Sequence, residues 1–112
     1  MSYKRTVPTV YAVVFPDLHI LKVGYSGGQR WRNFVARGAE VLELIEFDDT
    51  EEAHAFEGST HQYLRSRLGP GFRSANDAEP HLGIGGGGWG ETYLVPHGIN
   101  PRQVLAEMSV AK

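Results

Sequence analysis

The sequence predicts one small α/β (α+β) domain, in which a small central antiparallel three-stranded sheet is flanked by helices. Three observations lead to this prediction. Short β-branched and aromatic runs of strand length alternate with segments whose apolar residues recur at helical spacing. The chain has 112 residues, which is the usual size of one domain. A hydrophobic fraction of 41% is enough for one core, so we expect residues 1–112 to fold as a single unit.

The first two strands are predicted at residues 9–15 and 20–25. Both runs are rich in Val, Ile, Leu and Tyr, which favour extended backbone, and Pro16-Asp17 ends the first run with a turn signal. Because the gap between the runs is short, we expect the two strands to pair as an antiparallel hairpin.

A short helix and a third strand are predicted to follow the hairpin. Apolar residues recur at helical spacing from Trp31 to Val35, and Gly38 provides a helix stop, so we place this helix at residues 29–37. Residues 41–47 form the next apolar run. The length of that run suits the third strand of the sheet.

The longest helix is predicted at residues 50–68. Asp49 followed by Glu52 resembles a capping box at its start. The apolar residues lie largely on one side of this helix. A second stripe is polar, and its members are His54, Glu57, His61 and Arg65. This stripe makes the helix a candidate to carry chemistry.

Residues 69–90 are predicted to be a long loop, because they are interrupted by Gly69-Pro70-Gly71, by Pro80 and by four consecutive glycines. We expect this loop to be mobile without a ligand. Its glycines match the pattern GxGxxG at residues 83–88. No predicted strand leads into them and no helix follows in the required way, so we reject a dinucleotide-binding loop.

The end of the chain adds two short elements to this prediction. Residues 92–95 form a short strand or an edge segment. Asn100-Pro101 is a helix cap followed by proline at the first helical position, so a final helix is predicted at about 101–108.

Charge is distributed unevenly although the net charge is only −2. Residues 1–37 carry six Lys and Arg side chains against the single Asp17. Residues 38–64 carry eight acidic side chains and no Lys or Arg. A protein that coats nucleic acid is far more basic than this, so any nucleic-acid partner is expected to be engaged locally.

The absence of cysteine limits the chemistry that this chain can perform. It excludes disulfides, a thiolate nucleophile and zinc sites built on cysteine. A metal would be held by carboxylate, imidazole or water, which favours Mg²⁺ or Mn²⁺. No apolar run reaches the length of a membrane span and no signal-peptide core follows the first residues, so we expect a cytoplasmic protein of a bacterium or of a phage-infected host, with no membrane partner.

Several short motifs occur in a characteristic order along the predicted elements. They are Thr9-Val10-Tyr11, Lys22-Val23-Gly24 followed by Tyr25-Ser26, then Arg32, then Glu57 and His61 in the long helix, and finally Gly90-Glu91-Thr92-Tyr93. Their order and spacing resemble the GIY-YIG nuclease superfamily, and more narrowly its divergent phage-type branch with a second motif of the KIG type. The resemblance covers about residues 9–95.

The resemblance implies a divalent-metal-dependent endonuclease that hydrolyses phosphodiester bonds of DNA. It assigns catalytic roles to five residues, which are Tyr11, Lys22, Arg32, Glu57 and His61. Glu57 is the expected ligand of Mg²⁺ or Mn²⁺. Three further residues are expected to bind substrate, and these are Tyr25, Arg30 and Arg37.

Elementary chemistry supports parts of this assignment independently. A tyrosine with a pKa of about 10 is almost entirely protonated at neutral pH, so Tyr11 needs a neighbouring positive charge to act as a base, and Lys22 on the paired strand is the expected source. Arg32 can grip phosphate oxygens in two places, with Arg30 as its nearest competitor. If the interpretation is right, Tyr11, Lys22, Arg32 and Glu57 converge on one cleft.

Other interpretations stay open at this point. Each residue also has a structural reading: Tyr11 and Tyr25 as core aromatics, Lys22 as a strand-edge charge, and the other side chains as solvated or ion-paired surface groups. A second function is a catalytically silent nucleic-acid-binding or phage regulatory protein that holds phosphates with its basic residues. A third is a homodimer or larger homo-oligomer whose acidic segment meets a basic surface of another copy.

Overall fold

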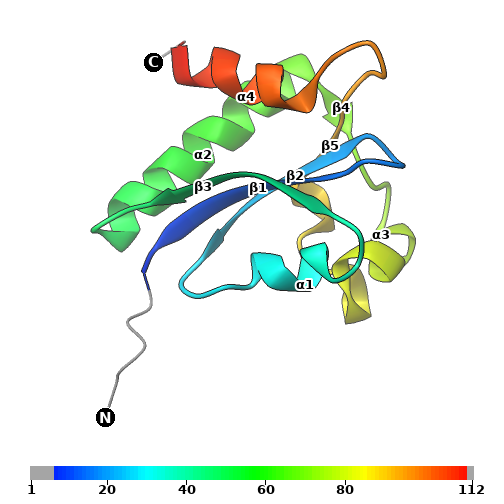
Figure 1. The fold of residues 1–112 in the computed structure, drawn as a ribbon, viewed down its shortest axis with the longest axis horizontal. Helices are drawn as coiled ribbons and strands as arrows, with labels where there is room; N and C mark the ends of the chain where they lie inside the picture. The colour runs from blue at the N-terminus through cyan, green and yellow to red at the C-terminus, as the bar shows by residue number, and fades with distance from the viewer. Residues whose placement is uncertain (1–6, 111–112) are drawn as a thin grey trace.

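A computed structural model describes residues 7–110, with side chains described as far as residue 106. The chain forms a mixed α+β domain around a five-stranded antiparallel sheet in the order β3-β1-β2-β5-β4 (Figure 1). The strands are β1 (Thr9–Phe15), β2 (Ile20–Ser26), β3 (Glu40–Glu46), β4 (Gly69–Pro70) and β5 (Thr92–Leu94). The α-helices are α1 (Trp31–Val35), α2 (Thr50–Arg67), α3 (Ala75–Leu82) and α4 (Pro101–Val110).

The three strands expected from the sequence are present, but the prediction of a three-stranded sheet is wrong. β1 and β2 form the expected hairpin, with Thr9 opposite Ser26 and Phe15 opposite Ile20. Two short strands extend the sheet beyond β2. β5 lies within the short strand or edge segment expected at residues 92–95 and pairs with β2, whereas β4, which was not expected, pairs with β5. β4 is only two residues long and contains Pro70, which cannot donate to a ladder and is tolerated here at the edge.

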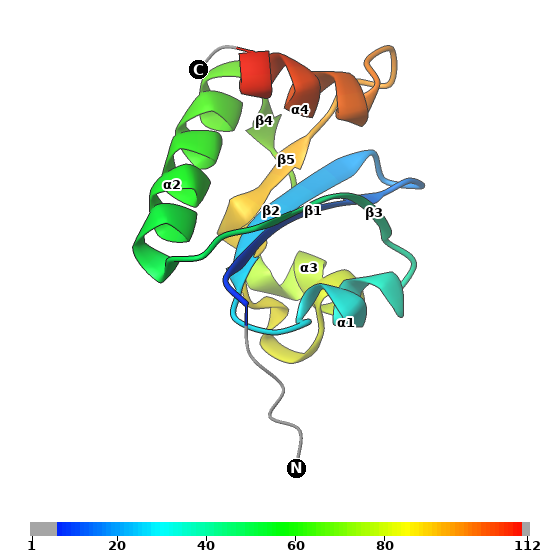
Figure 2. The same cartoon turned by 60° about the vertical axis from the view of Figure 1, so that its left-hand side comes forward.

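Helices cover both faces of the sheet. α2 and α4 lie on one face and α1 and α3 lie on the other (Figures 1 and 2). Alternate residues of β1 therefore enter two separate cores: Val10 and Ala12 belong to the core under α2 and α4, whereas Tyr11, Val13 and Phe15 belong to the core with α1 and α3. This alternation places Tyr11 and its neighbour Lys22 on the α1 and α3 side of the sheet.

The prediction of a long loop over residues 69–90 is also wrong. Most of the segment is ordered as β4, α3 and two turns of 3₁₀ helix, Ile84–Gly86 and Trp89–Glu91. Ser74 caps α3, since its side chain accepts a hydrogen bond from the backbone N–H of Asp77. Pro80 hid this helix from sequence reasoning, because proline inside a helix removes a backbone hydrogen bond and clashes with the preceding turn.

The remaining helices lie close to where the sequence predicts them. α1 is shorter than expected, because the chain leaves the helix at Ala36 and turns through Gly38, whose φ is 103°. α2 begins after Asp49, whose side chain accepts from the N–H of Glu51. Within the described residues, no helix is both long and apolar enough to span a bilayer.

The outer edge of β3 is the long free edge of the sheet within the described chain. β1 occupies only one side of this strand. Three acidic side chains along it, Glu40, Glu43 and Glu46, are exposed. β3 therefore presents a row of unpaired backbone groups next to negative charges.

Candidate active site

A cluster of charged side chains lies where β2 continues past its partner. β5 pairs only with Ile20–Lys22, so the second half of β2 has no strand on that side among the described residues. Glu91 immediately precedes β5 at this opening, and α2 contributes Glu57 and His61. One ligand atom from each of these three residues lies within 4.8 Å of the others. The long helix, the hairpin and the end of the 83–91 segment thus meet at one place.

His61 links the two carboxylates of this cluster. Its Nε2 lies 3.4 Å from Oε2 of Glu57 and 3.3 Å from Oε2 of Glu91, while its Nδ1 lies 2.5 Å from the Tyr93 hydroxyl. Carboxylates only accept hydrogen bonds, so Nε2 carries the proton that faces them. Nδ1 of a neutral His61 then accepts from the Tyr93 hydroxyl. The imidazole is thereby held in one tautomer and one orientation.

Lys22 is fully buried beside this cluster. Lys22 is 1% exposed. Its Nζ lies 3.5 Å from Oε1 of Glu91, and 5.6 Å from the ring centre of Tyr11 and from that of Phe34. Burial lowers the pKa of Lys22, and the charge of Glu91 opposes that effect. The pKa of Glu91 is lowered to about 2, chiefly by the hydrogen bond with His61 and then by the charge of Lys22. The reading of Lys22 as a solvated strand-edge charge is therefore excluded.

Tyr11 crosses the backbone of the second motif at very short range. A side chain at Gly24 would overlap the Tyr11 hydroxyl, because β1 and β2 place Tyr11 directly opposite Gly24. The glycine is thus required by close approach of an aromatic ring. Tyr11 is 2% exposed, and burial raises the pKa of its hydroxyl. The charge of Arg30 opposes this rise. Nζ of Lys22 lies 5.6 Å from the centre of the Tyr11 ring, so a contribution from Lys22 stays a prediction.

Arg30, and not Arg32, is the arginine directed towards this cluster. The charge of Arg30 acts on the pKa values of both Tyr11 and Lys22. The guanidinium of Arg32 lies 5.5 Å from the ring centre of Trp31 on an exposed part of α1. The structure thus brings together Tyr11, Lys22, Glu57 and His61 as the sequence predicts, and it leaves Arg32 outside.

The other two expected substrate-binding residues border the cluster from different sides. The ring of Tyr25 packs on His54 with ring centres 4.2 Å apart, and Nδ1 of His54 lies 3.5 Å from Oε1 of Glu57. Arg37 follows the end of α1, is exposed, and has its guanidinium beside Gly83. Tyr25 therefore supports the wall next to Glu57, and Arg37 belongs to a separate surface.

The glycine tract folds against the buried lysine. Gly88 has a φ of 85°, and a Cβ there would lie 2.8 Å from Nζ of Lys22. Gly86 has a φ of 61°, and a Cβ there would overlap the carbonyl group of Ala75. These two positions require glycine for both conformation and space. The tract therefore packs closely against Lys22 and Ala75. That it is mobile without a ligand stays a prediction.

Sequence reasoning missed the roles of Glu91 and Tyr93. Both stand in the closing motif, but no function could be given to them before their pairing partners were known. The useful signal is the register of β5, which sets Thr92 opposite Lys22 and so carries its neighbour Glu91 to the lysine. A buried lysine needs a counter-charge, and Glu91 provides it.

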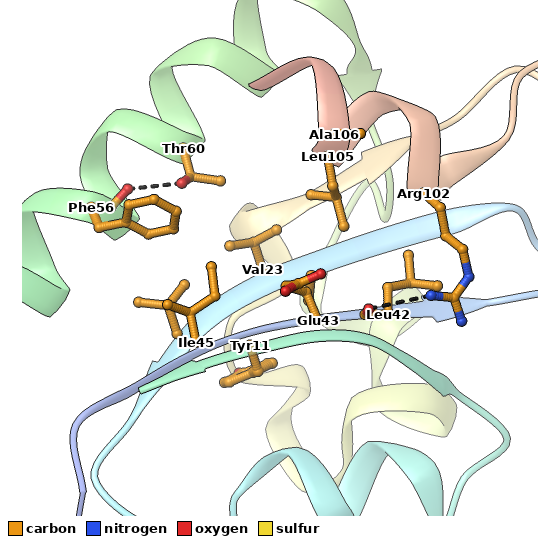
Figure 3. A pocket seen from close by; sticks show the side chains of 12 residues that line it. Tyr11, Val23, Leu42, Glu43, Ile45, Phe56, Thr60, Arg102, Leu105 and Ala106 are labelled. Atoms are coloured by element: carbon orange, nitrogen blue, oxygen red, sulfur yellow. Dashed lines mark hydrogen bonds between the residues drawn. The ribbon is translucent and has the colours of Figure 1, made fainter. Parts of the chain in front are cut away.

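An apolar pocket of about 140 Å³ lies on the face of the sheet that α2 and α4 cover, between these helices and β1 and β3 (Figure 3). Its walls include Val23, Ile45, Phe56 and Leu105, and the Arg102 guanidinium donates to the Leu42 carbonyl at 3.4 Å near its rim. None of Glu57, His61 and Glu91 lines this pocket, so it is distinct from the charged cluster although both involve α2.

No protein-family model, curated protein or solved structure matches this chain. Any functional assignment therefore depends on the chemistry of the residues described above.

Proposed function

We propose that this protein is a divalent-metal-dependent endonuclease that hydrolyses phosphodiester bonds of DNA. The observation that supports this proposal is the convergence of a buried lysine, a buried tyrosine, an arginine and a Glu-His-Glu group at one open edge of the sheet. Phosphodiester hydrolysis needs a positioned water, a base and positive charge around one phosphate. Residues from separate elements supply groups suited to each of these roles.

The ligand chemistry of the cluster fits Mg²⁺ or Mn²⁺. Glu57 and Glu91 offer carboxylate oxygens, which both ions prefer. Nε2 of His61 becomes a nitrogen ligand suited to Mn²⁺ when the imidazole proton lies on Nδ1 and is donated to the Tyr93 hydroxyl, which is the other tautomer of the ring. The charges of Lys22 and Arg30 balance those of the two carboxylates, so what favours a cation here is the set of ligand atoms that lie close together, not an excess of negative charge. A bound cation would offset charge on the phosphoryl oxygens and lower the pKa of a bound water.

The side chains around this group suit the other needs of the reaction. Lys22 and Arg30 carry positive charge for the phosphoryl oxygens and the leaving group. Tyr11 can accept the proton of the attacking water only as the phenolate. Burial opposes that form, and the charge of Arg30 favours it. Glu91, whose side chain is 39% exposed, lies on the solvent side of the cluster and so faces the direction from which a strand approaches.

The test is cleavage of supercoiled plasmid by purified protein in the presence of Mg²⁺ or Mn²⁺. Activity is expected to disappear with a chelator and with Glu57→Gln, which keeps the size of the side chain but removes its charge. Glu52→Gln is the matched control, since Glu52 is an exposed carboxylate in the first turn of the same helix. Equal cleavage by Glu57→Gln and the parent would refute the proposal.

One observation favours a second function. Tyr11 is almost completely buried and its pKa is raised, which describes a structural tyrosine as well as an unactivated base. A catalytically silent nucleic-acid-binding protein would use the same basic groups to hold phosphates. Binding of DNA by the parent without any cleavage, under both metals, would favour this function over the endonuclease.

A further inference from the structure

Ile84 is an apolar side chain held almost entirely in solvent. It is 98% exposed, far more than any other large hydrophobic residue of the described chain. It stands in the first 3₁₀ turn after α3, between Gly83 and Gly85. The side chain adds little to the core in this position. An exposed large apolar side chain is typical of a binding site, so we consider which ligand Ile84 contacts.

The backbone around Ile84 is fixed by glycines and hydrogen bonds. Gly83 and Gly85 have φ values of 102° and 82°, which favour glycine. The N–H of Gly83 donates to the Glu79 carbonyl, and the N–H of Gly85 donates to Oε2 of the same residue. The hydrogen bonds to Glu79 therefore hold the turn in one conformation and fix the position of Ile84.

A positively charged pocket lies directly beside Ile84. This arginine pocket is an open hollow of about 630 Å³ between α1 and the end of α3, and it is lined by Arg30, Asn33, Ala36, Arg37, Leu82, Gly83 and Ile84. No carboxylate is among these lining residues. Its size suits a small-molecule fragment, and its two guanidinium groups suit phosphate.

The arginine pocket adjoins the candidate active site through Arg30. A Cβ at Gly87 would lie 3.7 Å from Nη2 of Arg30, and the next residue, Gly88, lies against Nζ of Lys22. The charge of Arg30 also acts on Tyr11 and Lys22. A strand whose phosphate lies at the cluster would therefore place a neighbouring nucleotide at the pocket.

We propose that the arginine pocket binds one unpaired nucleotide of a nucleic-acid strand, with Ile84 against the face of its base and Arg37 on its phosphate. This inference rests on the proposed function, which places a phosphate of the same strand at the charged cluster. It defines the substrate as a single strand or a locally unpaired region. Bases stacked within a duplex hide their faces, so an apolar side chain can reach one only where the stack is open. Arg37 adds charge without reading sequence.

The experiment measures binding without cleavage. In the Glu57→Gln background and without metal, fluorescence anisotropy is recorded with a single-stranded DNA oligonucleotide, the RNA of the same sequence and a blunt DNA duplex. Ile84→Ala should weaken single-strand binding about fivefold and leave duplex binding unchanged. Arg37→Gln should lower the slope of log affinity against log salt by about 0.7 for the single strand. Tighter binding of the DNA or of the RNA oligonucleotide shows whether the pocket prefers deoxyribose or ribose.

Matched controls are available on remote parts of the surface. Ile99→Ala removes another exposed isoleucine, before α4, and Arg102→Gln removes an exposed arginine near β3, so neither should change binding. The proposal that the arginine pocket binds an unpaired nucleotide would be refuted by either of two results. One is duplex binding as tight as single-strand binding, and the other is equal affinities for Ile84→Ala and its background.

The two proposals fail in distinguishable ways. If the parent never cuts but Ile84→Ala weakens single-strand binding, nucleotide binding by the arginine pocket is supported and the endonuclease proposal fails. If the parent cuts but Ile84→Ala binds every oligonucleotide as its background does, the endonuclease proposal is supported and nucleotide binding by the pocket is refuted. A parent that binds neither DNA nor RNA also refutes nucleotide binding by the pocket.

Discussion

Replacing Gly24 with alanine tests the contact that joins the two N-terminal motifs. The new Cβ would overlap the Tyr11 hydroxyl and would also lie 2.7 Å from Cζ and 3.1 Å from Cε2 of the same ring. Comfortable carbon contacts lie at about 3.5–4.0 Å. The Tyr11 ring is buried against Phe34, with ring centres 5.7 Å apart, so it cannot turn aside freely. We therefore expect Gly24→Ala to destabilise the fold by about 2–3 kcal/mol, at the upper end of overpacking costs.

The same substitution at Gly58 should have the opposite sign. Gly58 lies inside α2, and a Cβ there meets nothing within 4 Å. Alanine in an open helical position is expected to stabilise the protein by about 0.5–1 kcal/mol. The two variants should consequently differ by about 3 kcal/mol, which is a large part of the stability of a typical domain.

Urea denaturation of both variants measures this difference. A double-mutant cycle identifies its cause: in a Tyr11→Ala background, Gly24→Ala should cost less than about 1 kcal/mol, because the ring is gone. An unchanged cost in that background would show that the strain lies elsewhere. A Gly24→Ala protein as stable as the parent would refute the close approach itself.

Three further predictions concern the charged cluster. Arg30→Gln should lower plasmid cleavage about a hundredfold and Arg32→Gln less than threefold, as judged by initial rates, because only Arg30 is directed towards the site. The pKa of Glu91 is lowered from 4.5 to about 2, so the stability that Glu91 contributes is fully present above pH 4.5 and is lost as the pH falls towards 2. Its side chain is 39% exposed, so solvent screening limits this to about 1 kcal/mol, and the stability difference between the parent and Glu91→Gln in denaturation curves should shrink on acidification. Gly88→Ala should destabilise the protein by about 2 kcal/mol in the same assay, since it strains the backbone and crowds Lys22.

Strong periodicity explains which parts of the fold were predictable. The hairpin and α2 have long runs of alternating or helical pattern, and their bounds agree with the structure within about two residues. α3 and β4 escaped prediction because they are short and contain Pro80 and Pro70. β5 lies where a short strand or edge segment was expected, but its place beside β2 was not predicted. Their formation depends on pairing with β2 and packing on the sheet, which no local pattern encodes.

The candidate site was predictable where a residue is fixed by a long element. Tyr11, Lys22, Glu57 and His61 stand on strands or on α2, so their direction follows from register and helical turn. The sequence could not decide whether Arg30 or Arg32 faces the cluster, because α1 is only five residues long and Arg30 precedes it. Glu91 required the register of β5, a strand of three residues.

The acidic edge of β3 has a consequence for the behaviour of the protein in concentrated solution. An unpaired strand edge can add a strand from a second molecule and seed aggregates. If two β3 edges approach as antiparallel neighbours, Glu40, Glu43 and Glu46 of each copy face like charges on the other. Electrostatic repulsion thus keeps the copies apart at neutral pH and low salt. High ionic strength weakens this repulsion, so edge-to-edge pairing of β3 is least favoured in dilute buffer of low salt.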